Sequence, residues 1–462
     1  RTSRLEKTRT QIKKQMTFDT TKILAAATPE DRTKEAAAFA DSLKITDLAK
    51  LPGATINSLK AALADKGKGN ANARAGALAT FRAISVAFGA QAESILVPLI
   101  PDALEALADK MKPVSVEADK FIEALFANLS AHATMAVMPH ILAEYDGKWQ
   151  SNLGRAQLLG KIADHPKQTN RLLKDIIPVL SGLMWDTKPQ VKETSIASMN
   201  KCCGTVSNKD IIGSVPAMVK CIEEPQLVPE TVHKLAGIVF VQEIEASALA
   251  IMGPLLKRGM DDPATATKRN CARIIENMSK LVDDPFEVEP FVPLLLPQLN
   301  RAKEEVADPE CRTVCEKAHE QLDQTSKRPA VWQRIEREKV LNSLKDIAGK
   351  GAEETVLAYV AALAHSMLDM KILGANEWKA TLSGHLGLVL APGQVEGAIT
   401  KFLEVCAKDV KIEEEKEEAD DAEQLCDCQF SLAYGNKVLL NQTMLKLKRG
   451  YRYGFCGKND SG

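Results

Sequence analysis

The end of this 462-residue sequence carries a spacing of glycines that could bind phosphate. Gly457 and Gly462 enclose four residues in the pattern G-x-x-x-x-G, directly after a segment with strand-like alternation. In loops of this kind, backbone N–H groups hold phosphates at the start of a helix. The pattern predicts a nucleotide contact by six consecutive residues, Gly457, Lys458, Asn459, Asp460, Ser461 and Gly462. An incomplete motif of this length also occurs by chance, so its weight depends on its context.

An aromatic residue precedes this loop at a suitable distance. Tyr434 lies 23 residues before Gly457 and ends the alternating run Phe430, Leu432, Tyr434, which predicts a strand. ATP-binding cassettes place an adenine-stacking aromatic at about this distance, whereas a lone aromatic on a strand is otherwise a core residue. The given sequence stops at Gly462, before the positions of the lysine and the serine or threonine that complete a phosphate loop. We therefore expect no catalytic residue within this sequence.

Five basic residues could contact nucleic-acid phosphates. They lie near the starts of predicted helices, in two groups: Lys188 and Lys192, then Lys268, Arg269 and Arg273. The net charge of the chain is −1, which excludes a general attraction for polyanions and requires a local cluster. Reversal of Lys268 and Arg269 is then expected to weaken binding to such a partner. A solvated helix face is the alternative interpretation of the same charges.

The ten cysteines show no C-x-x-C pair, so we expect reduced, mostly buried thiols rather than disulfides or a zinc module. Cys311, Cys315 and His319 would share one helix face and could in principle hold a metal, but a structural zinc site needs a fourth ligand. Cys426 and Cys428 point to one face of a predicted strand, where core packing is the favoured interpretation. No metal site is predicted.

A recurring proline indicates the helices on which the basic residues lie. It returns at steps of 38, 39, 38, 38 and 43 residues, with an apolar residue six places later and an acid eight places later in five of six cases. A kinked first helix followed by a second helix, at a period near 40, is typical of HEAT repeats. We expect paired antiparallel helices over residues 84–323, with the proline in each first helix: Pro101, Pro139, Pro178, Pro216, Pro254 and Pro297.

The complete array is predicted over residues 17–325, with less regular leading repeats at 20–95 and second helices such as Lys192–Cys203 and Lys268–Leu281. Glycine-separated helical patterns then predict a four-helix bundle at 330–408. An acidic run predicts a linker at 411–424, because like charges repel one another. The expected fold class is mainly α, with an α/β domain beginning at 425–462. The expected bundle helices are Val331–Ile347, Glu353–Met370, Glu377–Leu390 and Gln394–Ala407.

Composition favours a cytoplasmic protein. The chain is 45% hydrophobic, 26% charged and 5% aromatic, with no secretory signal and no run of 18 apolar residues. The first sixteen residues carry six basic residues against Glu6. Three interpretations remain open for this leader: an incomplete sequence, translation that begins at Met16, or a transit peptide.

Four stretches are similar to translation elongation factor 3 of fungi and algae. They are NKDIIGSVPAMVKCIEEPQLVPETVHKL, KRNCARIIENMSKLVDDP, VADPECRTV and LCDCQFSLAYGNKVLLNQTMLKLKRGYRYGFCG. The resemblance extends from the repeats to the last residue, and its final stretch is the most specific. It implies a longer, monomeric ATPase with HEAT repeats, a four-helix bundle, two ATP-binding cassettes and a ribosome-binding insertion.

The resemblance further implies that ATP hydrolysis with Mg²⁺ assists late translocation and releases deacylated tRNA from the exit site. The HEAT array is implied to contact the small-subunit head, ribosomal RNA and ribosomal proteins, with elongation factor 1A as a further partner. Tyr434 would stack on adenine and residues 457–462 would form the phosphate loop. Two positions depart from the family pattern, which has proline where Lys458 stands and glycine where Asp460 stands. The carboxylate of Asp460 near a triphosphate puts nucleotide affinity in doubt.

Two alternative functions stay open. A related cassette protein that acts in termination or recycling would share this layout. A non-catalytic HEAT scaffold, such as a nuclear-transport receptor or a ribosome-associated kinase activator, would share the repeats but not the strand that runs into glycines. The codons that follow Gly462 distinguish the last possibility, since G-K-S/T supports the ATPase.

The acidic linker generates the first testable prediction. Residues 411–423 hold too many like charges to be buried together, so limited proteolysis is expected to cut there first. Cleavage within the repeats while this segment stays intact would contradict the linker.

Overall fold

A computed structural model describes residues 18–143, 147–330, 332–349, 351–410, 424–434, 437–450 and 453–454. The chain divides into two compact units, residues 1–411 and 412–462, and each is described by itself. The predicted acidic run lies outside the described residues, apart from its last position.

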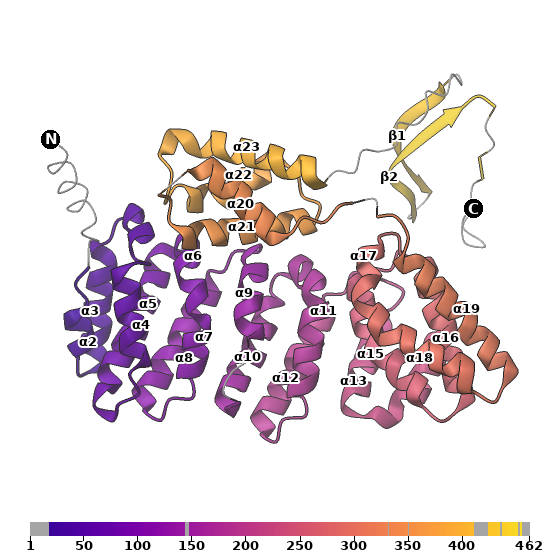
Figure 1. Cartoon of the computed structure of the whole chain (residues 1–462), viewed down its shortest axis with the longest axis horizontal. Coiled ribbons are helices and arrows are strands. Elements are labelled where there is room, and N and C mark those ends of the chain that lie inside the picture. The colour runs from indigo at the N-terminus through magenta and orange to yellow at the C-terminus, as the bar shows by residue number, and fades with distance from the viewer. Residues whose placement is uncertain are drawn as a thin grey trace, which may run out of the picture. The chain divides into compact units, whose positions relative to one another are not determined.

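Six successive helix pairs form the regular part of the first unit, and Figure 1 shows their helices side by side. The prediction of paired helices is confirmed. In chain order the pairs are α7 (Ile100–Ala106) with α8 (Lys112–Ala127), α9 (Ala133–Leu142) with α10 (Trp149–Ile162), α11 (Pro166–Leu183) with α12 (Pro189–Cys203), α13 (Val215–Glu223) with α14 (Val228–Ala236), α15 (Ala246–Asp261) with α16 (Thr265–Lys280), and α18 (Val292–Glu305) with α19 (Pro309–Ser326).

Every recurring proline lies in the first helix of its pair, as predicted, but in two different settings. Four lie inside their helices: Pro139, Pro178, Pro254 and Pro297. Pro101 and Pro216 instead lie in the first turns of α7 and α13, each directly after a 3-10 turn, η4 (Val97–Leu99) or η5 (Ile212–Ser214). Proline is tolerated there because the first turn leaves its N–H positions without intrahelical partners.

The recurring acid shapes the turn between the two helices of a pair. Asp109, Asp186 and Asp262 each accept a hydrogen bond from the backbone N–H two residues ahead, at 2.8, 2.9 and 2.8 Å. Such a side chain replaces a backbone partner and closes a tight turn. The acid column found in the sequence is therefore a turn-forming column in these repeats.

Second helices of neighbouring repeats approach closely, α10 against α12 and α16 against α19. The contacts use small residues whose hydroxyls bond to the facing helix. Ser198 Oγ donates to Ala156 O at 2.7 Å, and Thr325 Oγ donates to Ser279 O at 2.9 Å. A Cβ at Gly160 would lie only 2.5 Å from Ser198 Oγ. These positions explain how buried hydroxyls are satisfied while the helices stay near one another.

The leading helices are less regular, as expected. They are α2 (Thr21–Ala25), α3 (Pro29–Ser42), α4 (Ala54–Ala64), α5 (Ala71–Phe88) and α6 (Glu93–Leu96), with 3-10 turns η1 (Ile45–Lys50), η2 (Lys68–Asn70) and η3 (Gly89–Ala92). Buried Arg74 of α5 pairs with Asp109 at 2.9 Å and so joins them to the first regular repeat. Three short elements lie among the later repeats: η6 (Pro225–Leu227), α17 (Pro285–Val288) and η7 (Glu289–Phe291).

Among the described residues, one helical stretch, Lys68–Ala106, is long and apolar enough to cross a membrane by length and composition. Over half of its apolar window, 56%, is buried inside the protein. Its main helix, α5, packs against α3, α4 and α8. The stretch is therefore accounted for as a core segment of the array.

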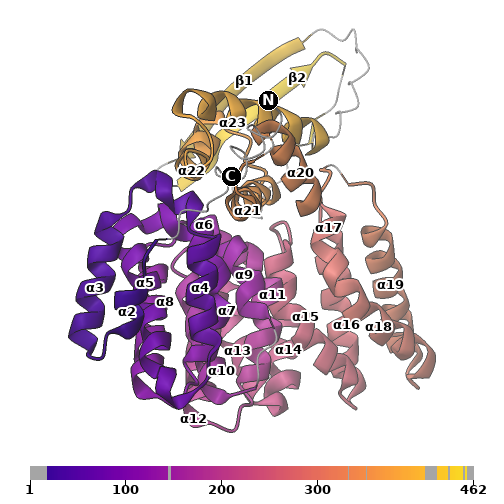
Figure 2. The ribbon, with the colours of Figure 1, turned by 60° about the vertical axis from the view of Figure 1, so that its left-hand side comes forward.

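Four further helices complete the first unit: α20 (Arg337–Ala348), α21 (Glu354–Asp369), α22 (Ala375–Leu386) and α23 (Pro392–Val410). Each packs against its sequence neighbour, and α20 also packs against α23. Trp378 is fully buried with its ring centroid 5.5 Å from that of Phe402. Helix α21 also contacts α6 and α9 of the array, and Figure 2 shows these helices together from a second side.

The predicted start of the first of these helices was wrong. Helix α20 begins at Arg337 and not at Val331. The residues before it are held by distant partners, since Gln333 N donates to Val410 O at 3.2 Å and Arg334 Nη2 donates to Phe286 O at 3.1 Å. These long-range bonds replace the local i to i−4 bonds of a helix.

The second unit contains an antiparallel hairpin of β1 (Gln424–Tyr434) and β2 (Lys437–Lys448). The predicted change from helical to strand periodicity is confirmed here. Register irregularities occur between Gln424 and Cys426 and again between Phe430 and Ala433. The assignment of residues 425–462 to a nucleotide-binding domain stays a prediction.

Close packing of the leading helices generates a stability prediction. A Cβ at Gly76 would lie 2.7 Å from Ile23 O and 3.1 Å from Leu24 Cα, so G76A is expected to cost about 1–3 kcal/mol by overpacking. The matched control is Gly182 in α11, where a Cβ meets nothing within 4 Å. G182A should be neutral or stabilise by up to about 1 kcal/mol through helix propensity. Thermal melts of both variants test this; equal melting temperatures would contradict the close approach.

Candidate functional site

The first predicted basic group lies at a turn between paired helices. Lys188 is exposed and directly precedes the first residue of α12, Pro189. Lys192 lies one turn further and pairs with Glu223 of the next repeat, 3.1 Å between Nζ and Oε1. The structure thus leaves the Lys188 side chain directed to solvent, while the charge of Lys192 is partly compensated.

The second predicted group is engaged with neighbouring residues. Lys268 Nζ donates to Met260 O at 2.7 Å, Arg269 pairs with Glu310 at 2.8 Å, and Arg273 reaches the same carboxylate at 3.7 Å. Glu310 belongs to α19, so both arginines connect α16 to the following repeat. Phosphate binding by these residues stays a prediction, and it requires that a phosphate compete with Glu310.

Charge is distributed unevenly along the array. Residues 148–222 hold eleven lysines and arginines against five acids, whereas residues 261–330 hold ten against fourteen. The basic surplus of the repeats therefore lies on α10 to α13, around Lys188, and not around Lys268. Because binding to a polyanion depends on local clusters, the first group is the better placed of the two.

Trp185 is a surface aromatic that the sequence reasoning missed. Its side chain is 59% exposed, two residues after the end of α11 and three residues before Lys188. The repeat pattern could have indicated this residue, since Trp185 directly follows Met184, the apolar residue six places after Pro178. Exposed aromatics beside cations can stack on unpaired bases. The corresponding turn between α7 and α8 carries the exposed Lys110, and the exposed Lys112 is the first residue of α8. We call Lys110, Lys112, Trp185 and Lys188 the turn edge.

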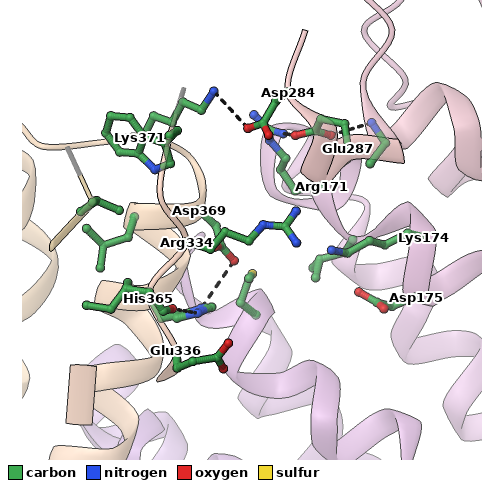
Figure 3. Close-up of a pocket in the computed structure, with 17 residues that line it drawn as sticks. Arg171, Lys174, Asp175, Asp284, Glu287, Arg334, Glu336, His365, Asp369 and Lys371 are labelled. Atoms are coloured by element: carbon green, nitrogen blue, oxygen red, sulfur yellow. Dashed lines mark hydrogen bonds and ion pairs between the residues drawn. The ribbon is translucent and has the colours of Figure 1, made fainter. Parts of the chain in front are cut away.

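A second candidate is a cavity of about 310 Å³ between the array and the segment that leads to α20. Figure 3 shows charged side chains from both walls directed towards it. Arg171 pairs with Glu287 at 2.7 Å, Lys371 with Asp284 at 3.8 Å, and His365 with Asp369 at 3.4 Å.

These charges hold the cavity walls together. Arg334 lies with its guanidinium 4.6 Å from the ring centre of Phe286, and Glu287 also accepts from Ala246 N at 2.6 Å. Burial raises the pKa of Asp175, which lines the same cavity. Cations and anions alternate and largely pair with one another, so the arrangement resembles a joint more than a binding site for one class of ion.

A buried polar cluster joins α6 to α21 and α22. The Glu93 carboxylate accepts hydrogen bonds from Ser130 N at 2.6 Å, Ser130 Oγ at 2.8 Å and Tyr359 Oη at 2.5 Å. His385 Nε2 lies 3.9 Å from Glu93 Oε2. Burial raises the pKa of Glu93 and lowers the pKa of His385 to about 4. The imidazole is therefore neutral at neutral pH.

Seven of the nine described cysteines are buried, as predicted. Cys311 and Cys315 lie in the core of α19, and no group of three potential metal ligands occurs among the described residues. The core interpretation of Cys426 and Cys428 was wrong, because Cys428 is exposed and Cys426 is half-buried. Strand alternation gave the shared face correctly but not which side of the hairpin is covered.

The predicted nucleotide-binding residues are only partly described. Tyr434 is the last residue of β1. The loop residues 457–462 lie outside the described residues, so their contact with a nucleotide stays a prediction. Binding of ATP and Mg²⁺ likewise stays a prediction.

The repeated pairs, their prolines and their turn acids define a HEAT-repeat protein. Two family models match the chain, the EF3 N-terminal HEAT repeat over residues 31–199 and the elongation factor 3/GNC1 HEAT repeat over residues 226–332. Elongation factor 3 of Gonapodya prolifera is 39% identical over 392 residues, which are 80% of this chain and 36% of that protein. Elongation factor 3 of Zygosaccharomyces rouxii is 35% identical over 462 residues, which cover 95% of this chain and 43% of that protein.

The chain is a homologue of elongation factor 3 and carries the HEAT repeats of that family. It spans less than half the length of these relatives. The resemblance inferred from the four sequence stretches is confirmed. The structure adds Lys110, Lys112 and Trp185 to the predicted Lys188, and it adds the joint with the four following helices, which the sequence did not predict.

The buried cluster predicts a pH dependence of stability. His385 binds a proton less readily when folded than when unfolded, so the stability that it contributes is complete above pH 6.5 and is lost as the pH falls towards about 4. The expected loss between pH 7.5 and 5.5 is about 1 kcal/mol. The raised pKa of Glu93 acts in the opposite sense. H385Q should flatten the profile, while H233Q at an exposed position of α14 should not.

Melting temperatures across this pH range measure the effect. An H385Q profile as steep as that of the unchanged protein would show that other groups dominate.

Proposed function

We propose that this chain is the ribosome-binding part of an ATP-driven translation elongation factor. The main support for this proposal is the match of two long parts of the array to the HEAT-repeat models of elongation factor 3. In this proposal the intact protein hydrolyses ATP with Mg²⁺ to assist late translocation and exit-site tRNA release. Its partners are the small-subunit head, ribosomal RNA and proteins, tRNA and elongation factor 1A, and it acts as a cytoplasmic monomer.

The physical basis for ribosome binding is the turn edge. A HEAT array offers a long surface to a large partner, and its aligned turns can meet successive backbone phosphates. Lys110, Lys112 and Lys188 are exposed on two such turns, and Trp185 adds a flat surface on which a base can stack. Since the net charge of the chain is −1, such local cations must supply the attraction.

The remainder of the chain fits the same proposal. We assign the helices α20 to α23 to the four-helix bundle expected at 330–408. The alignment with the Zygosaccharomyces rouxii factor covers 95% of the chain and so extends beyond the repeats into β1. The proposal also assigns Tyr434 to adenine and residues 457–462 to the phosphate loop, where Lys458 and Asp460 depart from the family pattern.

Ribosome co-sedimentation without ATP tests the proposal. The chain is expected to bind, with affinity that falls steeply with salt because each neutralised phosphate releases counterions. In K110E/K188E the slope of log affinity against log salt should become shallower by about 2. Exposed charges contribute little to folding, so the helical content should not change.

Two further double variants show whether the loss of binding is specific to the turn edge. K268E/R269E changes the predicted second group and should weaken binding less than K110E/K188E, since Arg269 is already paired with Glu310. K234E/K257E is the charge-matched control, because both lysines pair within their own helices. Equal binding by all variants, independent of salt, would refute phosphate contact by the repeats.

A further inference from the structure

The cysteines of the described residues fall into two chemical classes. Burial raises the pKa of Cys202, Cys203 and Cys271 to about 12, and the remaining thiols of the first unit are also buried. Since the thiolate is the reactive form, such groups are inert. Cys426 and Cys428 of the second unit are the accessible pair among these residues.

The accessible thiols lie side by side. Residues two apart on a strand project from the same face, and the Sγ atoms of Cys426 and Cys428 are 3.4 Å apart. Cys426 faces Leu447 and Cys428 faces Leu445 across the hairpin. The register irregularity between Gln424 and Cys426 lies directly before the pair. The two sulfurs are thus placed near one another by the backbone, and one of them is open to solvent.

We propose that Cys426 and Cys428 form an oxidisable dithiol, which peroxides convert to a reversible intrachain disulfide. The Cys428 thiol loses its proton, and the thiolate attacks one oxygen of hydrogen peroxide, which breaks the O–O bond and forms a sulfenic acid. The other oxygen leaves as hydroxide and takes up a proton to become water. The Cys426 sulfur then attacks the sulfenic sulfur, its proton leaves, and the sulfenic oxygen departs as a second water. Two thiols therefore supply the two electrons that reduce one peroxide.

The surroundings of the two thiols determine which of them reacts first with peroxide. The hydrogen bond shared by the thiols raises the pKa of Cys426, and the Asp427 carboxylate acts in the same direction. The proton is therefore retained on Cys426, while Cys428, the more exposed of the two, meets the oxidant first. A nearby second thiol that resolves the sulfenic acid is the arrangement found in redox-sensitive pairs.

Disulfide formation should strain the strand and so remain reversible. Two residues of strand span about 6.4–6.8 Å between Cα atoms, which is the upper end of the range that disulfides accept. Closure must shorten β1 between Cys426 and Cys428, against its pairing with Leu445 and Leu447. Strained, exposed disulfides are readily reduced. The site depends on residues 424–428 and their strand partners alone and is independent of the ribosome proposal.

Peptide mass spectrometry of the whole chain tests the proposal. Trypsin is expected to release residues 417–437, a peptide that holds Cys426 and Cys428 but no other cysteine. After reduced protein is exposed to hydrogen peroxide and then alkylated, this peptide should appear unalkylated and lighter by two hydrogens. Treatment with dithiothreitol before alkylation should restore two alkylated thiols. Cys271 serves as the internal control and should remain reduced until the protein is unfolded.

Two variants separate the roles of the thiols. In C426S, peroxide should leave a sulfenic acid on Cys428 that dimedone traps, and in C428S dimedone labelling at Cys426 should be several-fold slower. Circular dichroism checks that both remain folded. The proposal is overturned if the unchanged chain gives only sulfinic or sulfonic acids at these positions. Disulfides to Cys456 or to a second molecule in place of the 426–428 bond, or native alkylation of Cys428 no faster than that of Cys271, would also overturn it.

Discussion

The close approach of second helices in neighbouring repeats is the constraint on which the array depends. Gly160 leaves room for Ser198, whose hydroxyl bonds to Ala156 O, and Thr325 repeats this bond at Ser279. Such contacts satisfy buried hydroxyls and set the spacing of the repeats. Where α10 meets α12 and α16 meets α19, this contact holds one repeat to the next. The turns that carry Lys110 and Lys188 lie at equivalent places in their repeats, between the first and the second helix of a pair.

The joint with the four following helices has a different chemistry. Glu93 is buried and accepts three hydrogen bonds, two from Ser130 and one from Tyr359 of α21. The nearby cavity is lined by ion pairs such as Arg171 with Glu287. Removing one partner of a buried polar contact leaves the other unsatisfied, which costs far more than the contact contributes. We therefore expect the array and these helices to respond to mutation at the joint as one body.

The helix pairs could be predicted because prolines, apolar positions and turn acids are local and periodic. The role of the acid column was not predictable from the pattern, since it depends on hydrogen bonds through which Asp186 and its equivalents close turns. Long-range partners were not predictable from the sequence. Gln333 N donates to Val410 O, so that α20 begins later than predicted. Arg269 is paired with Glu310, which lies 41 residues further along the chain. Likewise, alternation placed Cys426 and Cys428 on one face, but exposure depends on what packs against the hairpin.

We propose that the turn edge of the HEAT array contacts ribosomal RNA. Electron cryomicroscopy of this chain bound to ribosomes at low salt tests it most directly. We expect Lys110, Lys112 and Lys188 to lie against RNA backbone, with the ring of Trp185 on an unpaired base. A map in which these turns face solvent while the helices around Lys268 and Arg273 contact the RNA would contradict it.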